Sequence, residues 1–273
     1  ITTINLNEGI TQVYEYAFSG CSSLENVNLP STLKSIGGYA FYNCSNLDSV
    51  EILGSVTSIG NYAFSGCKAL TTNIGNGVIT IGDYAFSGCT SLGNQTFPST
   101  LTSIGSSAFR YCTSFTEINV PKNVTNIGSS AFSDCSTVEK ISIEEGVKTI
   151  GEYAFQNINK VTTLVIPTTV TSMGRSIFSG MSALEELTVP FVNRNFGDLF
   201  SNYSFDDAIK TVQHYQYGSS IQYGTSTYYI PKNLTTITIS KATQIYYNSF
   251  ENCSQITTIN LNEGITQVYE YAF

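Results

Sequence analysis

Apolar and polar residues alternate along this chain in short stretches that recur about every 23 residues. The clearest unit is "LENVNLPSTLKSIGGYAFYNC", residues 24–44. Val27 and Leu29 alternate with Asn28, which is the pattern of a β-strand with one buried face. Pro30 has no amide hydrogen to donate to a strand ladder, so the predicted strand ends there.

The second half of the unit predicts two further elements. Leu33 and Ile36 form another short apolar stretch, which predicts a second, shorter strand, and Gly37 permits a turn after it. Phe41 and Cys44 have the spacing of one helical turn that faces inward. We therefore expect one coil to contain a strand, a turn, a short strand and a helical turn.

The repeated phenylalanine defines the period of these coils. From the first to the eighth occurrence the intervals are 23, 23, 22, 23, 23, 23 and 23 residues, followed by one of 72 and one of 23. The positions are Phe18, Phe41, Phe64, Phe86, Phe109, Phe132, Phe155, Phe178, Phe250 and Phe273. A single coil of this length cannot bury its apolar face, whereas stacked coils cover one another. The sequence thus predicts a repeat solenoid, a right-handed leucine-rich-repeat-like coil with a parallel β-ladder, short second strands and short helical turns.

The long interval predicts an interruption within one domain of residues 1–273. Regular coils are expected over residues 1–190 and 232–273, with an irregular insert at about residues 191–231. Within the insert, "FGDLF" resembles a degenerate form of the repeated turn, and a segment rich in Tyr and Ser follows it. Loops of more than about 15 residues are uncommon and often functional. We expect an inserted loop or hairpin rather than a domain boundary.

The charge of the chain argues against some classes of binding partner. The net charge is −8, and the 12 Lys and Arg residues are scattered along 273 residues. An acidic surface without a basic stripe argues against nucleic acid and against anionic membranes. No apolar run approaches the roughly 18 residues needed to span a bilayer, so membrane insertion is not expected. The sequence shows no signal peptide, and we expect it to be a segment of a longer protein.

The seven cysteines suggest a packing role. Each stands three residues after a repeated phenylalanine, and the next two coils have Ile158 and Met181 at that position. A position that accepts Cys, Ile or Met favours a medium-sized apolar side chain in the core. Zinc sites use paired ligands such as C-x-x-C, which do not occur, so neither a metal nor a cofactor is expected. The predicted core comprises Phe41, Phe64, Phe86, Phe109, Phe132, Phe155, Phe178, Cys44, Cys67, Cys89, Cys112 and Cys135.

Catalytic chemistry has little support in the sequence. His214 is the single histidine, and it lies in the insert near Asp206 and Asp207. A Ser-His-Asp arrangement is conceivable in any Ser-rich chain, so this proximity carries little weight, and an exposed loop histidine is the favoured interpretation. No sequence motif for a nucleophile or a phosphate-binding loop is present. We predict that the protein is not an enzyme.

Two repeated positions are candidates for contact with a partner. The outward-facing middle residues of the main strands are polar, mostly neutral and expected to form a flat face, which suits extended contact with a protein or glycan better than a small-molecule pocket. A tyrosine row, two residues before the phenylalanine, either forms an adhesive stripe or packs on its own neighbours along the stack. The candidate contact residues are Asn28, Glu51, Asn119, Ser142, Thr188, Tyr39, Tyr62 and Tyr84.

Three units carry a resemblance to a known family. "LENVNLPSTLKSIGGYAFYNC", "FTEINVPKNVTNIGSSAFSDC" and "VTTLVIPTTVTSMGRSIFSGM" resemble BspA-like leucine-rich repeats, the class also associated with treponemal surface proteins. The resemblance implies an extracellular or surface-attached protein of bacteria or parasitic protists. It also implies a role in adhesion to host matrix or in cell–cell aggregation, and it supplies no catalytic residues and no defined ligand.

Two distant segments of the chain are identical. Residues 1–18 and 256–273 both read "ITTINLNEGITQVYEYAF", whereas residues 138–155 match the first segment at only 7 of 18 positions. This difference predicts a second level of repetition with a period of 255 residues. A filament or stalk of tandem blocks, joined within one chain or by end-to-end docking of copies, is one interpretation, because length and avidity benefit from copies. The alternative is a discrete adhesin for a host or glycan ligand, and an engineered duplication would also explain the identity.

Overall fold

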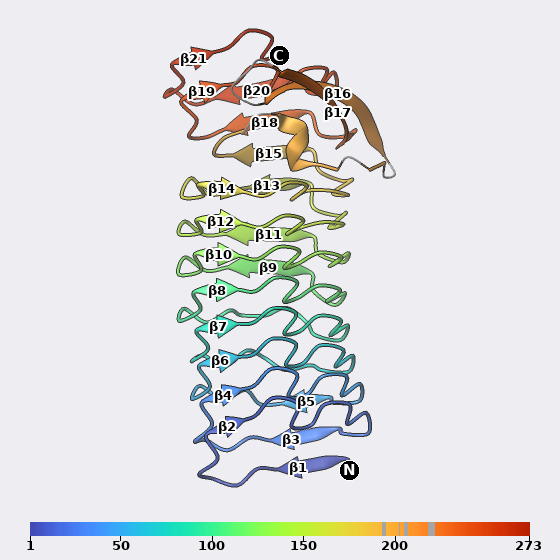
Figure 1. Cartoon of the computed structure of the whole chain (residues 1–273), viewed down its shortest axis with the longest axis vertical. Helices are drawn as coiled ribbons and strands as arrows, with labels where there is room; N and C mark the ends of the chain where they lie inside the picture. Colours follow the sequence, from blue (N-terminus) through green and yellow to red (C-terminus); the bar gives the residue numbers. More distant parts are fainter. Residues whose placement is uncertain (193–194, 202, 205–206, 218–221) are drawn as a thin grey trace.

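The computed structural model describes residues 1–192, 195–201, 203–204, 207–217 and 222–273, with the backbone alone described for residues 212–217 and 222–224. The chain forms a parallel β-solenoid of about 11 coils, with about 23 residues in each coil. The coils stack into a straight column, with residue 1 at one end and residue 273 at the other (Figure 1). The predicted solenoid is confirmed.

One side of the column, the main-strand face, carries the longer strands in three separate parallel sheets. Alternation places every second side chain inside, so that Ile118 and Val120 are buried and Asn119 is exposed. The sheets contain β1 (Thr3–Asn5), β3 (Asn26–Asn28) and β5 (Ser49–Val50); β9 (Glu117–Val120) and β11 (Lys140–Ile143); and β13 (Thr163–Val165), β15 (Glu186–Val189), β18 (Thr236–Ile239) and β20 (Thr258–Leu261).

The opposite side, the short-strand face, carries strands of two residues that form one continuous eight-stranded sheet. The buried apolar residue of each strand lies in register with that of the next coil, as Ile36 does with Ile59. The strands are β2 (Gln12–Val13), β4 (Ser35–Ile36), β6 (Ser58–Ile59), β7 (Thr80–Ile81), β8 (Ser103–Ile104), β10 (Asn126–Ile127), β12 (Thr149–Ile150) and β14 (Ser172–Met173), with β19 (Gln244–Ile245) paired to β21 (Gln267–Val268) beyond the insert.

The third side of each coil, the turn side, contains the repeated phenylalanine and differs from the helical turn that the spacing predicts. In the second coil the amides of Tyr39, Phe41 and Asn43 donate to carbonyls of the following coil at 2.9, 2.8 and 2.8 Å, while the alternate amides donate three residues back within their own coil. Tyr39 and Asn43 have φ values of 55° and 56°, which interrupt any helix. In the described residues the one helix is the 3₁₀ helix η1 (Phe196–Leu199).

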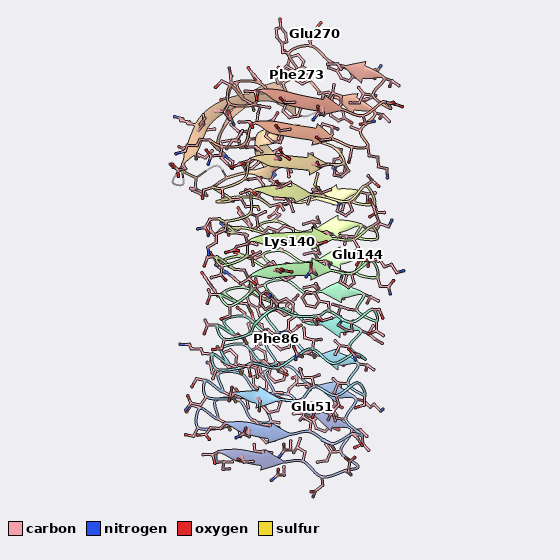
Figure 2. All side chains as sticks on the ribbon, turned by 180° about the vertical axis from the view of Figure 1, so that it is seen from behind. Glu51, Phe86, Lys140, Glu144, Glu270 and Phe273 are labelled. Carbon is pink, nitrogen blue, oxygen red and sulfur yellow. The ribbon has the colours of Figure 1, made fainter. Side chains whose placement is uncertain are left out.

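The interior of the column is a stack of aromatic rings. Consecutive rings from Phe18 to Phe155 lie 5.2–5.9 Å apart between centroids, with interplanar angles of 2–18°. Figure 2 shows how the side chains fill the space between the strands, with Phe86 labelled. The seven phenylalanines and five cysteines expected in the core each have an exposed fraction of 0%.

The insert contains an antiparallel hairpin of β16 (Ala208–Tyr217) and β17 (Gln222–Pro231), which lies beside the last coils (Figure 1). Hydrogen bonds attach its base to the turn side. The Tyr228 hydroxyl donates to the Asp198 carboxylate at 2.8 Å, and the Thr211 hydroxyl donates to the Asn252 carbonyl at 2.9 Å. Burial raises the pKa of Tyr228. The hairpin is therefore anchored to the column at its base.

Candidate functional site

The main-strand face presents the polar residues that the sequence nominates as contacts. Asn28, Glu51, Asn119 and Ser142 are exposed, and Thr188 is half-buried. Side chains on this face bond between coils, as the Asn28 amide does when it donates to the amide oxygen of Asn5 at 2.5 Å. The face is consequently a polar, hydrogen-bonding surface that runs along the column and includes exposed charged side chains such as Glu51 and Lys140.

This face has a break between β5 and β9, where the described residues of two coils form no main strand. There, two buried polar side chains form the hydrogen bonds that link neighbouring coils. The Thr72 hydroxyl donates to the carbonyl of Val50. The Gln95 side chain accepts from the Ile74 amide at 3.0 Å and donates to the Thr72 carbonyl at 3.1 Å. Hydrogen bonds from the Thr72 hydroxyl and the Gln95 side-chain amide thus replace the backbone pairing of the regular coils.

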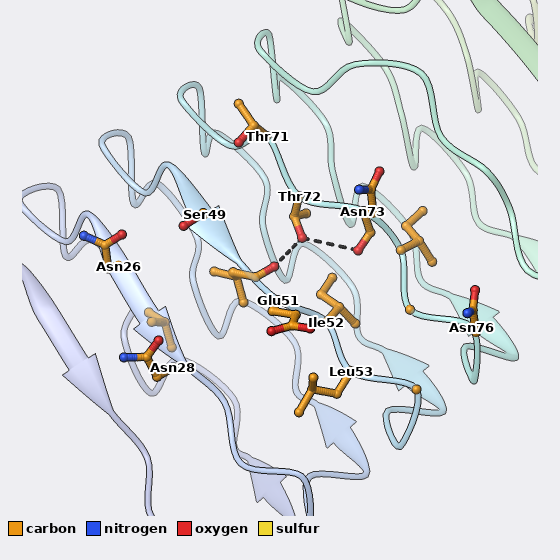
Figure 3. A pocket seen from close by; sticks show the side chains of 15 residues that line it. Asn26, Asn28, Ser49, Glu51, Ile52, Leu53, Thr71, Thr72, Asn73 and Asn76 are labelled. Atoms are coloured by element: carbon orange, nitrogen blue, oxygen red, sulfur yellow. Dashed lines mark hydrogen bonds between the residues drawn. The ribbon is translucent and has the colours of Figure 1, made fainter.

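The break opens a hollow of about 610 Å³ on the main-strand face (Figure 3). Its polar lining consists of amides and hydroxyls, and Glu51 is the one charged residue among the residues that line it. Ile52 and Leu53 contribute apolar surface. Glu51 and Asn28 were predicted to lie on this face, whereas the hollow itself was not predicted. Two signals point to it, namely the single 22-residue interval and a glutamine, Gln95, where most other coils have Val, Ile or Leu.

The tyrosine row on the turn side packs on itself. The rings of Tyr16, Tyr39, Tyr62 and Tyr84 are nearly parallel, with centroid separations of 4.8, 4.6 and 4.5 Å. Partial burial among these neighbours raises the pKa of Tyr39 and of Tyr62. Because each ring covers the face of the next, the row presents ring edges and hydroxyls to solvent rather than open aromatic faces.

The cysteine row combines packing with a weak hydrogen bond. From Cys44 to Cys135 each thiol lies 3.0–3.3 Å from the carbonyl oxygen of the phenylalanine one coil earlier. The six cysteines from Cys21 to Cys135 are free thiols. Burial raises the thiol pKa to about 11 at Cys44 and about 12 at Cys135, which keeps these sulfurs protonated and unreactive at neutral pH. Across the described residues, no group of three or more His, Cys, Asp or Glu could hold a metal ion.

The residues considered for catalysis fall in or beside the insert. The backbone of His214 pairs with Thr225 within the hairpin, whereas its side chain and all of Asp206 lie outside the described residues. The Asp207 carboxylate forms an ion pair with Lys232. In the described part of the chain, no helix is both long enough and apolar enough to cross a membrane.

Comparisons with known proteins agree with the repeat. The family model described as "BspA type Leucine rich repeat region" matches residues 1–93, 79–211 and 160–273, with six copies. The crystal structure of a leucine-rich repeat protein from T. pallidum is 30% identical over 67% of this chain and 78% of that one, with a TM-score of 0.51. A leucine-rich repeat protein from Bacteroides ovatus is 23% identical over 99% of this chain and 72% of that one, with a TM-score of 0.48. No curated protein matches.

Proposed function

Because the chain belongs to the BspA-type leucine-rich repeat family, we propose that it is a non-enzymatic, extracellular or surface-attached protein with a structural and adhesive role. In this proposal residues 1–273 act as one domain, and the solenoid is part of a longer tandem array. The partners are other blocks of the same sequence and a host matrix protein or glycan.

The identity of residues 1–18 and 256–273 carries this proposal. The coil of residues 1–18 binds the next coil through the amides of Tyr16 and Phe18, which donate to carbonyls of that coil at 3.1 and 2.8 Å. The Glu8 carboxylate accepts from both the amide and the hydroxyl of Ser31 at 3.0 Å, and the amide bond lowers the pKa of Glu8. The Glu263 carboxylate and the amides of Tyr271 and Phe273 correspond to these groups in the second copy. A segment with the sequence of residues 19–44 would therefore have the same hydrogen-bond partners there.

Electron microscopy of the native material tests the array. Eleven coils at the strand spacing of about 4.8 Å advance roughly 50 Å, so we expect a thin filament with an axial repeat near that length, marked once per period by the hairpin. Isolated particles of a single 29.7 kDa solenoid, without lengthwise periodicity, would contradict the array.

A discrete adhesin is the second candidate, and the hollow at the break of the main-strand face favours it. Binding of the purified chain to immobilised matrix proteins would be weakened by Asn73→Ala, which alters the lining of the hollow. Asn126→Ala is the matched control, since Asn126 is exposed on the opposite, short-strand face and does not line the hollow. Equal binding by both variants would place the contact elsewhere.

A further inference from the structure

Two adjoining hollows lie on the turn side, next to the base of the insert. Each has a volume of about 420 Å³, and Asn157 lines both. The first is also lined by Tyr111, Thr113, Asp134, Ser136, Asn159, Gly180 and Ser182. The second extends from Arg110 and Tyr153 to Tyr203 and Ser204. Because they share a residue, the two hollows form one surface, which we call the turn-side groove.

The chemistry of the groove is polar, aromatic and electrically balanced. No aliphatic side chain is among its lining residues, so its apolar surface comes mainly from tyrosine rings. Tyr111 and Tyr203 are 45% and 73% exposed, whereas Tyr39, Tyr62 and Tyr84 of the stacked row are half-buried. Arg110 and Asp134 are the charged residues of the lining, and they form an ion pair of 3.3 Å.

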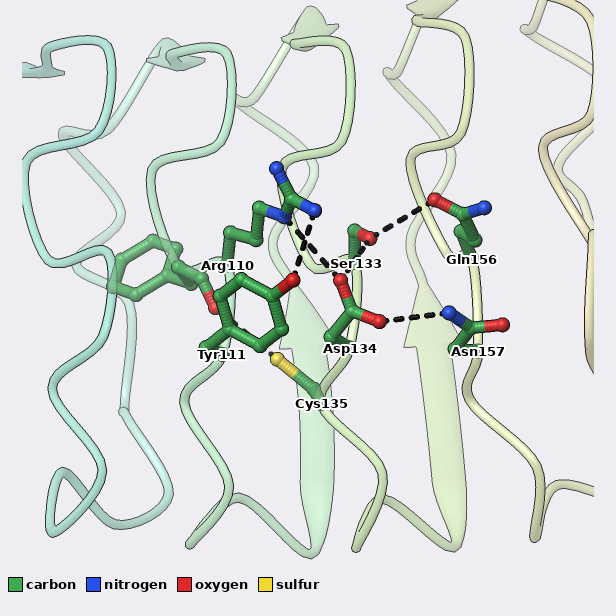
Figure 4. Close-up of polar contacts among 8 residues, drawn as sticks. Arg110, Tyr111, Ser133, Asp134, Cys135, Gln156 and Asn157 are labelled. Carbon is green, nitrogen blue, oxygen red and sulfur yellow. Dashed lines mark hydrogen bonds and ion pairs between the residues drawn. The ribbon is translucent and has the colours of Figure 1, made fainter.

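A hydrogen-bond network fixes the polar groups (Figure 4). The Asp134 carboxylate accepts from the Ser133 hydroxyl at 2.9 Å and from the Asn157 amide at 2.7 Å. The Arg110 guanidinium donates to the Tyr111 hydroxyl at 3.0 Å and lies 4.6 Å from the centre of that ring. The lining is therefore ordered before any ligand arrives.

The backbone of the groove holds large residues where other coils use glycine. Tyr111, Asp134 and Asn157 have φ values of 61°, 64° and 59°. The corresponding residue, two after the repeated phenylalanine, is a glycine in four other coils, at Gly20, Gly66, Gly88 and Gly180. A left-handed backbone is unfavourable for a non-glycine residue, although least so for Asn and Asp. Three consecutive coils accept this cost, and in doing so they project an aromatic ring, a carboxylate and an amide into the groove.

We propose that the turn-side groove binds a neutral oligosaccharide. Exposed tyrosine rings match the C–H face of a pyranose, and the fixed amides, hydroxyls and carboxylate match its hydroxyl groups as donors and acceptors. The internal ion pair leaves no net charge to attract an anionic sugar, and the lack of an aliphatic pocket removes the usual anchor for a peptide side chain. This inference rests on the adhesive part of the proposed function and is independent of the tandem array.

A glycan microarray with neutral gluco-, xylo-, manno-, galacto- and chito-oligosaccharides, alongside sialylated and sulfated glycans, tests the proposal. Neutral oligosaccharides should bind, and calorimetry with the strongest of them should show at least a tenfold loss of affinity in Tyr111→Gly and in Asn159→Ala. Tyr111→Gly suits the backbone, because glycine fills this position elsewhere, so its melting temperature should stay close to that of the parent. Asn43→Gly changes the same repeat position outside the groove and should bind as the parent does.

The proposal is overturned if no neutral glycan binds, if only charged glycans bind, or if Tyr111→Gly and Asn159→Ala bind the selected sugar as tightly as the Asn43→Gly control. If the protein still adheres to a matrix protein in such a case, the adhesive function is retained and only the glycan site is excluded.

Discussion

The short-strand face and the main-strand face belong to the same coils, yet one sheet runs without a break through eight coils while the other is divided into three. The coil with the 22-residue interval explains much of this difference. Its short strand stays in register, with Ile59 opposite Ile81, so the main-strand side accommodates the missing residue. Continuity on one side of a solenoid allows the other side to vary.

Glycines beside the short strands explain why that side tolerates so little change. A Cβ on Gly105 would lie 2.5 Å from the carbonyl carbon of Gly82 in the preceding coil. On the main-strand side the surroundings vary: a Cβ on Gly54 or Gly93 would meet nothing within 4 Å, whereas a Cβ on Gly75 would clash with the carbonyl oxygen of Ile52. The close backbone approach recurs from coil to coil beside the short strands, whereas on the main-strand face it is local and side chains such as Gln95 form bridges between coils.

The largest expected effect comes from the interior that both faces share. Phe109→Ala removes a fully buried ring from the aromatic stack and should reduce the free energy of unfolding by about 3–5 kcal/mol. Chemical denaturation followed by circular dichroism measures this change. Tyr14→Ala, at a tyrosine that is 71% exposed, is the control. A loss below about 1 kcal/mol at Phe109 would mean that the stack does not support the column.

Gly105→Ala tests the short-strand face directly. The added methyl group must displace backbone, so we expect a loss of about 1–3 kcal/mol in the free energy of unfolding. Gly54→Ala, the matched control on the main-strand side, should change stability by less than about 0.5 kcal/mol, since its Cβ has open space. Equal losses in the two variants would remove the proposed difference between the faces.

Gln95→Ala tests the bridge across the break. The Ile74 amide and the Thr72 carbonyl would lose their partner in a buried place, which should cost about 1–3 kcal/mol in thermal or chemical unfolding. Thr96→Ala alters the exposed neighbour and should be nearly silent. If neither substitution lowers the free energy of unfolding, the Gln95 bridge does not stabilise the main-strand face.

Cys112→Val should have a small effect, below about 1.5 kcal/mol, because the substitution keeps an apolar side chain of similar volume in the core. The Phe86 carbonyl that accepts from the Cys112 thiol also accepts from the Cys89 amide at 3.1 Å, so it keeps a partner. Unfolding of the parent should not respond to reducing agent. A loss larger than this, or a dependence on reducing agent, would contradict a packing role for the cysteine row.

The smallest effect is a pH dependence at the corner between the two faces. The Glu145 carboxylate accepts from the Thr168 amide at 3.0 Å, and this bond lowers its pKa. Because the folded pKa lies below the unfolded value, the contribution to stability is fully present above about pH 4.3 and is lost as the pH falls through the folded pKa. The melting temperature of Glu145→Gln should therefore approach that of the parent at pH 3, and a constant difference from pH 3 to 7 would exclude this contribution.

Much of the fold could be predicted because each coil repeats the same physical solution. Val27, Pro30 and Gly37 indicate a strand, its end and a turn, and the repetition indicates stacking. The turn side was predicted less well. The spacing of Phe41 and Cys44 fits two structures equally well, a helical turn and a series of turns interrupted by left-handed residues. The spacing alone does not distinguish them.

The candidate sites were harder to predict because they form between coils. Gln95 in place of Val marked the break on the main-strand face, but only the stacked structure shows which backbone groups it bridges. The turn-side groove unites Tyr111, Asp134 and Asn157, which are 23 residues apart and differ in chemistry. Their shared repeat position, which glycine occupies in four other coils, was the available signal, and it lies outside the buried positions that the repeat pattern marks.

The turn-side bonds between coils also determine how the column responds to tension. A pull along the axis of the column loads these bonds, and a coil at a free end of a stack detaches before an internal coil, because a single neighbour holds it. Each coil that detaches releases about 23 residues, or roughly 75–80 Å of extended chain, in place of a rise of about 5 Å. Under load the solenoid would lengthen in steps while the remaining coils stay folded, and so act as an extensible tether.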